Sequence, residues 1–140
     1  MIPVDRRYVL GFLFDKTFRV ALVRKKTGPG GQKGKLNGFG GKIEGDETPL
    51  VAMQREFREE SGFARTRPKW HALYTIGDEW GGFEVHCFCA LVPGFKPFTG
   101  REAVEVYPIE AIPGPTVSRA RELVLEGAAT LRKLLDRGMV

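Results

Sequence analysis

The chain contains 140 residues, of which 42% are hydrophobic and 28% are charged. This length and balance are typical of one folded domain with an apolar core, and they exclude a disordered chain. The formal net charge of +5 favours an anionic partner without naming one. The apolar run over residues 8–14 is too short to cross a bilayer and lacks the cleavage site of a signal peptide, so we predict a cytoplasmic protein without membrane association.

In chain order, the sequence predicts two strands, a glycine-rich loop, a helix, three more strands and a final helix. Strands are predicted where apolar residues alternate or run together between turn residues, and helices where they recur every three or four residues. The loop is predicted over residues 26–41. The predicted strands cover residues 8–14, 19–25, 69–76, 83–92 and 104–109, and the predicted helices cover residues 49–61 and 118–137. This order predicts one α/β or α+β domain over residues 1–140, with a mixed sheet covered by two helices.

The two cysteines, Cys87 and Cys89, lie one residue apart within the predicted strand 83–92. At that spacing both side chains point to the same face of a strand. We therefore predict buried core thiols rather than a disulfide or a zinc site.

The helix over residues 49–61 has recognisable ends. Thr48 can cap its first turn, Pro49 is tolerated at its first position, and Gly62 can terminate it. The last turns of this helix carry Glu56, Glu59 and Glu60 within about one helical turn, where like charges repel by a few tenths of a kcal/mol. Two interpretations remain open: a solvated acidic face, or a site for a hard divalent cation, which takes several oxygen ligands.

The stretch over residues 41–63 resembles the box that characterises the Nudix hydrolase family, G-x5-E-x7-R-E-U-x-E-E-x-G-U, where U is a bulky aliphatic residue. The fixed positions of the box are occupied by Gly41, Glu47, Arg55, Glu56, Glu59, Glu60 and Gly62. The two U positions carry Phe57 and Phe63, which keep the apolar character of those positions. The predicted order of strands and helices around the box is similar to that of the family as well.

This resemblance implies an α/β/α sandwich and the hydrolysis of a pyrophosphate bond in a nucleoside diphosphate derivative. It implies Mg²⁺ as the cofactor, with Mn²⁺ as an alternative. The implied metal ligands are the carboxylates of Glu56, Glu59 and Glu60 and the backbone carbonyl of Gly40. A metal-bound water would attack phosphorus while a carboxylate accepts its proton.

The resemblance also implies roles for residues around these ligands. Arg55 and Glu47 would orient the site through an ion pair. We expect the proton acceptor to be Glu59 or Glu60. Glu102, ahead of the strand 104–109, is the alternative acceptor, or else an ordinary surface glutamate.

Residues 35–42, KLNGFGGK, resemble the segment before the box in the branch that hydrolyses oxidised purine nucleoside triphosphates. In that comparison Asn37 would hydrogen-bond a purine edge and Gly41 would contact the substrate. That branch also carries a Trp and paired aspartates after its last strand. Residues 117–121 contain neither, so the sequence does not assign an oxidised purine as the substrate.

Basic and aromatic residues outside the box supply further candidate contacts. Arg24, Lys25, Lys26 and the loop lysines can contact a polyphosphate, or can be ordinary solvated charges at a strand end. Trp80 and Phe83 can stack on a base, or can pack on their own scaffold.

Two other classes of function are weighed against a nucleotide hydrolase. A domain that senses a nucleotide without cutting it can lose metal ligands, whereas this chain carries the full set of acids. An RNA 5′-end hydrolase would suit the net charge, but no basic stripe with interleaved aromatics is present. We therefore expect a small nucleotide as partner and no nucleic acid; a homodimer is left open.

Overall fold

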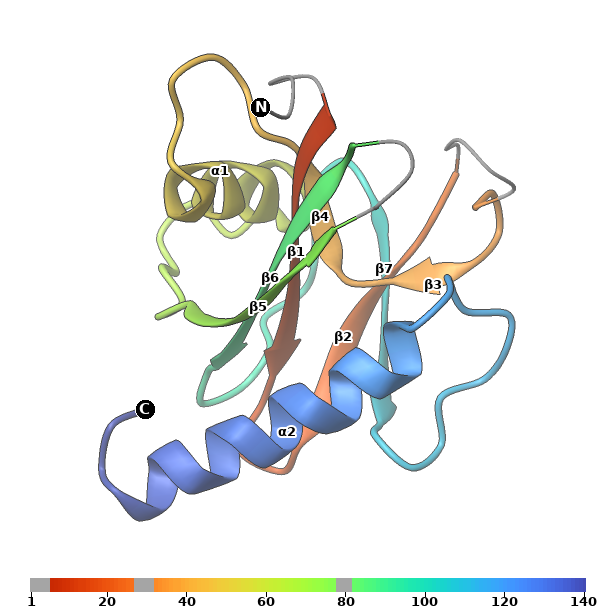
Figure 1. Ribbon diagram of the computed structural model, residues 1–140. Helices are drawn as coiled ribbons and strands as arrows, with labels where there is room; N and C mark the ends of the chain where they lie inside the picture. The colour runs from red at the N-terminus through yellow and green to blue at the C-terminus, as the bar shows by residue number, and fades with distance from the viewer. Residues whose placement is uncertain (1–5, 27–31, 78–81) are drawn as a thin grey trace.

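The computed structural model describes residues 6–26, 32–77 and 82–140. Within these ranges the chain forms a seven-stranded mixed sheet with one helix against each face (Figure 1). The elements are β1 (Arg7–Phe14), β2 (Arg19–Arg24), β3 (Leu36–Asn37), β4 (Phe39–Lys42), α1 (Pro49–Ser61), β5 (His71–Gly77), β6 (Glu84–Leu91), β7 (Ala103–Pro108) and α2 (Ala120–Asp136). The predicted mixed sheet between two helices is confirmed.

β1 is the central strand, and its two edges are occupied differently. One edge pairs in parallel with β6 along the whole strand, from Arg7 opposite Glu84 to Phe14 opposite Leu91. The other edge is shared, because β4 pairs with its first half and β2 with its last residues. β2 also pairs antiparallel with β7 along its full length. β4 and β2 therefore follow one another along the same edge of β1.

Alternate residues of the central strands build two separate cores. Val9 and Leu13 of β1 lie in the core under α1, whereas Phe12 and Phe14 lie in the core under α2. This is the period-two alternation of a strand that is covered on both faces. Cys87 and Cys89 are free and buried in the α2-side core, as predicted.

α1 begins and ends where the sequence predicts. The hydroxyl of Thr48 accepts a hydrogen bond from the Val51 amide at 3.2 Å. Gly62 ends the helix in the left-handed conformation with φ of 77°, and its amide donates to the Arg58 carbonyl. α2 begins two residues later than predicted, after Arg119, which also has a left-handed φ of 69°.

The prediction of a loop over residues 26–41 is wrong for its second half, which forms β3 and β4. Glycines give no apolar alternation, so the sequence pattern of a strand is missing there. The contacts explain the glycine at Gly40: a Cβ atom at this position would lie 2.1 Å from the Val9 carbonyl oxygen. β4 thus pairs with β1 at a distance that excludes a side chain. A membrane-crossing helix is not found within residues 6–26, 32–77 and 82–140.

Candidate active site

The three carboxylates of α1 differ in their surroundings. Glu56 and Glu60 are buried, whereas the side chain of Glu59 is 41% exposed. Oε1 of Glu60 accepts a hydrogen bond from the Gly40 amide at 2.8 Å. A Cβ atom at Gly41 would lie 2.6 Å from the carboxyl group of Glu56. Gly40 therefore binds the carboxylate of Glu60 through its amide, and Gly41 leaves room for the carboxylate of Glu56.

Arg55 connects the beginning of the box with its end. Its guanidinium makes two hydrogen bonds to Glu47, at 2.7 and 2.9 Å, and one to Glu56 at 2.8 Å. A further donor reaches the Lys42 carbonyl at 2.9 Å. The planar fork of arginine suits such paired contacts. Arg55 and Glu47 thus form an ion pair beside Glu56.

A loop from a distant part of the chain covers the end of α1. The amides of Thr99, Arg101 and Glu102 donate to the carbonyls of Ser61, Glu59 and Glu60 at 3.0, 3.0 and 3.4 Å. Helix ends leave carbonyls without partners inside the helix, and this loop supplies the partners. The loop thereby brings the side chains of Arg101 and Glu102 to the carboxylates of α1.

Arg101 is the site residue that the sequence did not single out. Its guanidinium lies 3.4 Å from Oε2 of Glu56, 3.5 Å from Oε2 of Glu59 and 3.9 Å from Oε1 of Glu102. No spacing within the box leads to this residue, because only the docking of residues 99–102 places it there. Glu102, by contrast, was a candidate, and it lies beside the site.

Burial and like charge determine the protonation of the acids. Burial raises the pKa of Glu60 to about 7; Lys25 opposes the rise, while Glu56 and Glu102 add to it. Burial also raises the pKa of Glu56, against the lowering effect of its hydrogen bond from Arg55. Both groups would be stabilised in their charged form by an additional cation.

The donor chemistry of this site fits a hard divalent cation. The candidate ligands are all oxygen atoms, and Oε2 of Glu102 is buried without a hydrogen-bond partner within the described residues. Within the described residues, no group of three His, Cys, Asp or Glu side chains is arranged so that it could hold a metal ion. Arg55 and Arg101 instead balance the carboxylates. A bound cation would take over the charge compensation that Arg101 provides.

A large cleft opens beside β4. It has a volume of about 700 Å³ and lies beside Gly40 and Gly41. Its walls come from β1, β4, β6 and the start of α2. The side chains that line it include Tyr8, Lys25, Asn37, Ile76, Phe83, Val85, Ser118 and Arg119. A cleft of this volume is in the range of sites for small molecules.

The predicted substrate contacts lie in different places. Asn37 is buried in the cleft, and its Oδ1 accepts from the Gly38 amide. Lys25 lines the cleft as well. Arg24 instead makes two hydrogen bonds to Glu105, at 2.6 and 2.8 Å, and one to the Gly34 carbonyl.

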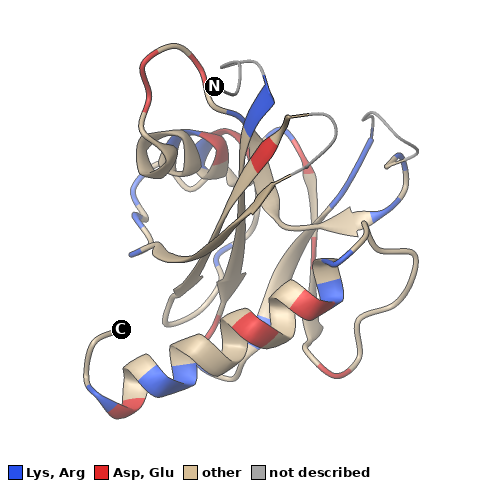
Figure 2. Ribbon diagram, in the orientation of Figure 1, with Lys and Arg blue, Asp and Glu red and all other residues tan. Residues whose placement is uncertain are grey.

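The remaining basic and aromatic candidates are also placed. Lys26 donates to the Arg101 carbonyl at 3.3 Å. Phe83 lines the cleft and is 36% exposed, whereas Trp80 lies outside the described residues. Figure 2 shows the basic residues at the end of β2 and the acidic residues near the end of α1.

The three-layer fold, with the segment 41–63 forming the carboxylate site, is that of a Nudix domain. The sequence profile of the NUDIX domain matches residues 4–126, and the chain therefore belongs to the Nudix family. A curated relative, the oxidized purine nucleoside triphosphate hydrolase of Danio rerio, is 43% identical over 76 residues. That match covers 51% of this chain and 46% of the relative, so it spans about half the length of either protein.

Solved structures show the same fold at lower identity. The NUDIX domain of Shewanella oneidensis NrtR, in complex with ADP ribose, superposes with a TM-score of 0.73 and 20% identity, covering 92% of this chain and 90% of that one. The dihydroneopterin triphosphate pyrophosphohydrolase of E. coli gives a TM-score of 0.71 and 16% identity, covering 93% and 99%. These likenesses establish the α/β/α sandwich that the sequence predicts.

Proposed function

We propose that the protein is a Mg²⁺-dependent pyrophosphohydrolase that acts on a small nucleotide, most simply a nucleoside triphosphate. The observation that carries this proposal is the position of β4. Its glycines contact the buried carboxylates of α1 and also border the 700 Å³ cleft. A nucleotide seated in the cleft would thus direct its phosphates toward the acids. The name of the Danio rerio relative supports a triphosphate as the substrate class.

The residues of the chain would divide the work of this reaction. Glu56, Glu59 and Glu60, with the Gly40 carbonyl, would hold the metal, and Mn²⁺ could replace Mg²⁺. When bound, the metal neutralises phosphate charge and lowers the pKa of a coordinated water. Arg55 would hold Glu56 in place through the hydrogen bond of 2.8 Å. Lys25 and Asn37 would bind the phosphates and the base from within the cleft.

Three carboxylates are candidates for the proton acceptor, and their surroundings differ. Glu59 is partly exposed and lies near two arginines. Glu60 already binds the Gly40 amide. Glu102 has a buried oxygen atom that is unpartnered within the described residues, which leaves that oxygen free to accept a proton. Loss of the acceptor should abolish the acidic limb of the pH–rate profile, where the rate rises as the acceptor loses its proton, whereas loss of a pure metal ligand should weaken metal binding.

The decisive test is a substrate screen with and without Mg²⁺. The panel contains canonical and oxidised nucleoside triphosphates, ADP-ribose, NAD, dinucleoside polyphosphates and triphosphorylated RNA, with phosphate and pyrophosphate release measured. We expect metal-dependent turnover of at least one small nucleotide. Undiminished turnover in excess chelator would refute the metal mechanism.

One alternative has support from a specific structure. The NUDIX domain of NrtR was crystallised with ADP ribose, which favours a nucleotide-binding module as the second candidate. Tight binding of ADP ribose without cleavage of any member of the panel would establish that alternative. Preferential turnover of triphosphorylated RNA would instead favour the RNA 5′-end hydrolase.

A further inference from the structure

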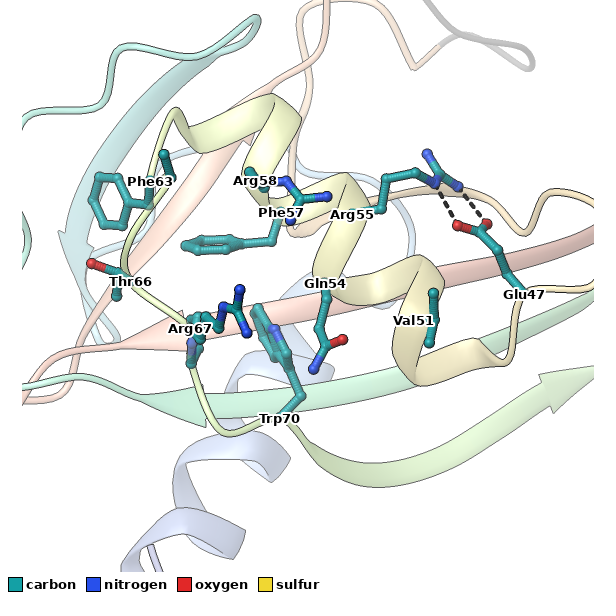
Figure 3. A pocket seen from close by; sticks show the side chains of 12 residues that line it. Glu47, Val51, Gln54, Arg55, Phe57, Arg58, Phe63, Thr66, Arg67 and Trp70 are labelled. Atoms are coloured by element: carbon teal, nitrogen blue, oxygen red, sulfur yellow. Dashed lines mark hydrogen bonds and ion pairs between the residues drawn. The ribbon is translucent and has the colours of Figure 1, made fainter.

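A second cavity, of about 330 Å³, lies between α1 and the segment that leads into β5 (Figure 3). The helix contributes Val51, Gln54, Arg55 and Arg58 to it, at the three- and four-residue spacing of one helical stripe. Glu56 and Glu60 lie on the other side of the helix. The cavity shares Glu47 and Arg55 with the box, but the candidate metal ligands do not line it, and it has no lining residue in common with the 700 Å³ cleft.

The floor of this cavity carries a polar atom without a partner. Trp70 is only 7% exposed, and its Nε1 has no hydrogen-bond partner within the described residues. The opposite corner of the indole is fixed against the sheet, because a Cβ atom at Gly11 would lie 2.8 Å from Cζ3 of Trp70. Nε1 lies at the other end of the indole from this contact, and Trp70 lines the cavity. Buried N–H groups in proteins are nearly always paired, so this one calls for an acceptor from outside the chain.

The rim of the cavity is positively charged. Arg58 and Arg67 are exposed and line it, and neither makes an ion pair with any residue that the structure describes. Figure 3 shows Arg67, Gln54 and Trp70 gathered at one end of the cavity. Arg55, at the other end, is already engaged by Glu47. Guanidinium and indole groups are donors only, so the free groups here require an acceptor.

We propose that this cavity is a second binding site, for a carboxylate or phosphate group carried on a planar, apolar body. The two free arginines and the Trp70 N–H would bind the anionic oxygens. Val51, which is 48% exposed, and the exposed Ala64 line the cavity and provide an apolar surface for the remainder of the ligand. The volume is at the lower end of the range for small-molecule sites.

Phenyl phosphate is a suitable probe, since it combines both features. The chain has two tryptophans, so W80F leaves Trp70 as the fluorophore. In buffer free of divalent metal, phenyl phosphate should change the fluorescence of W80F in a saturable manner. Benzyl alcohol, which keeps the ring without the charge, should not. Inorganic phosphate should bind more weakly than phenyl phosphate. Comparing the affinities of benzoate and phenyl phosphate distinguishes a carboxylate site from a phosphate site.

Variants locate the bound probe. R58Q/R67Q should weaken binding by about tenfold or more, since two charge-assisted contacts are lost. R65Q, which changes an exposed arginine of the same segment that does not line the cavity, should leave the affinity unchanged. W70F removes the N–H donor and should weaken binding measured by calorimetry.

Three outcomes would overturn the proposal. The first is the absence of saturable binding of either anion at any soluble concentration. The second is full affinity in a folded R58Q/R67Q variant. The third is loss of binding in K25A, which would place the probe in the 700 Å³ cleft instead.

Discussion

At the level of single residues, Arg101 stands where a cation is needed. Its guanidinium lies within 4 Å of three carboxylates, those of Glu56, Glu59 and Glu102. Without a metal ion, this charge reduces the repulsion that the acids of α1 impose on one another. A divalent ion and Arg101 would then compete for the same oxygens, and the arginine would have to turn away when the ion binds.

R101Q should therefore bind metal more tightly. We expect the dissociation constant for Mn²⁺ to fall by about tenfold, or about 1.4 kcal/mol, because no charged side chain has to be displaced. Titration of free Mn²⁺ by electron paramagnetic resonance measures this directly. R65Q is the control, and equal Mn²⁺ affinity in R101Q and the wild type would show that Arg101 does not compete.

Glu60 should be needed for turnover but not for folding. E60Q should lower kcat by roughly a hundredfold or more, because metal ligation or proton transfer is lost in the transition state. E110Q, at an exposed position outside the site, should be nearly unchanged. Wild-type turnover in E60Q would contradict the assignment.

The stability of metal-free E60Q should also differ from that of the wild type, in a way that depends on pH. The pKa of Glu60 is raised from 4.5 to about 7 in the folded protein, so its ionisation opposes folding increasingly as the pH rises between these values. Metal-free E60Q should therefore be more stable than the wild type at pH above 7 and should lose this advantage below pH 4.5. Thermal melts at several pH values in chelator check the sign.

Lys25 and Arg24 are neighbours with different expected roles. K25A should raise KM for the nucleotide with little change in kcat, because Lys25 lines the cleft. R24A should lower the melting temperature instead, since its donors are occupied by Glu105 and the Gly34 carbonyl. Steady-state kinetics and thermal melts on both variants separate the two roles. A raised KM in a stable R24A variant would return Arg24 to the substrate site.

At the level of elements, the pairing of β4 with β1 depends on the absence of a side chain at Gly40. G40A would place a methyl group 2.1 Å from the Val9 carbonyl oxygen, so β4 and β1 must move apart. We expect a loss of about 1–3 kcal/mol in the free energy of unfolding. Denaturant unfolding measures it, and G94A, where a Cβ atom meets nothing within 4 Å, is the control. Equal stability of the two variants would show that β4 tolerates a side chain.

The pairing of β2 with β7 should depend on pH through Glu105. The hydrogen bond from Arg24 lowers the pKa of Glu105 from 4.5 to about 2. Its contribution to stability is therefore complete above pH 4.5 and is lost as the pH falls toward 2. The difference in melting temperature between the wild type and E105Q should be largest near neutral pH and shrink over this window. A constant difference would indicate that the ion pair is not its source.

At the level of the whole molecule, metal binding should be visible in the stability of the domain. An ion that binds only the folded state at a hundred times its dissociation constant adds about 2.7 kcal/mol to the free energy of unfolding. Mg²⁺ or Mn²⁺ should thus raise the melting temperature of the wild type. E56Q and E60Q should show a much smaller rise. A rise in both variants equal to that of the wild type would place the ion elsewhere.

Much of this architecture could be predicted from the sequence, because apolar periodicity and end signals are local. Thr48 and Gly62 bound α1 as expected, and Cys87 and Cys89 pack in the α2-side core. The sequence does not predict β3, because two residues are too few to show a pattern, or β4, because two of its four residues are glycines. Arg101 was not predicted because its position results from a tertiary contact.

The loop over residues 99–102 holds α1 with main-chain amides, including that of Arg101. The side chain at position 101 is therefore free to vary without loss of the anchor. A substitution there would change the charge facing the acids while the helix end keeps its hydrogen bonds. The affinity of the acids for a cation and the integrity of the scaffold would thus be separable at this one position. Exchange of this single amino acid would then tune the affinity of the acids for a cation.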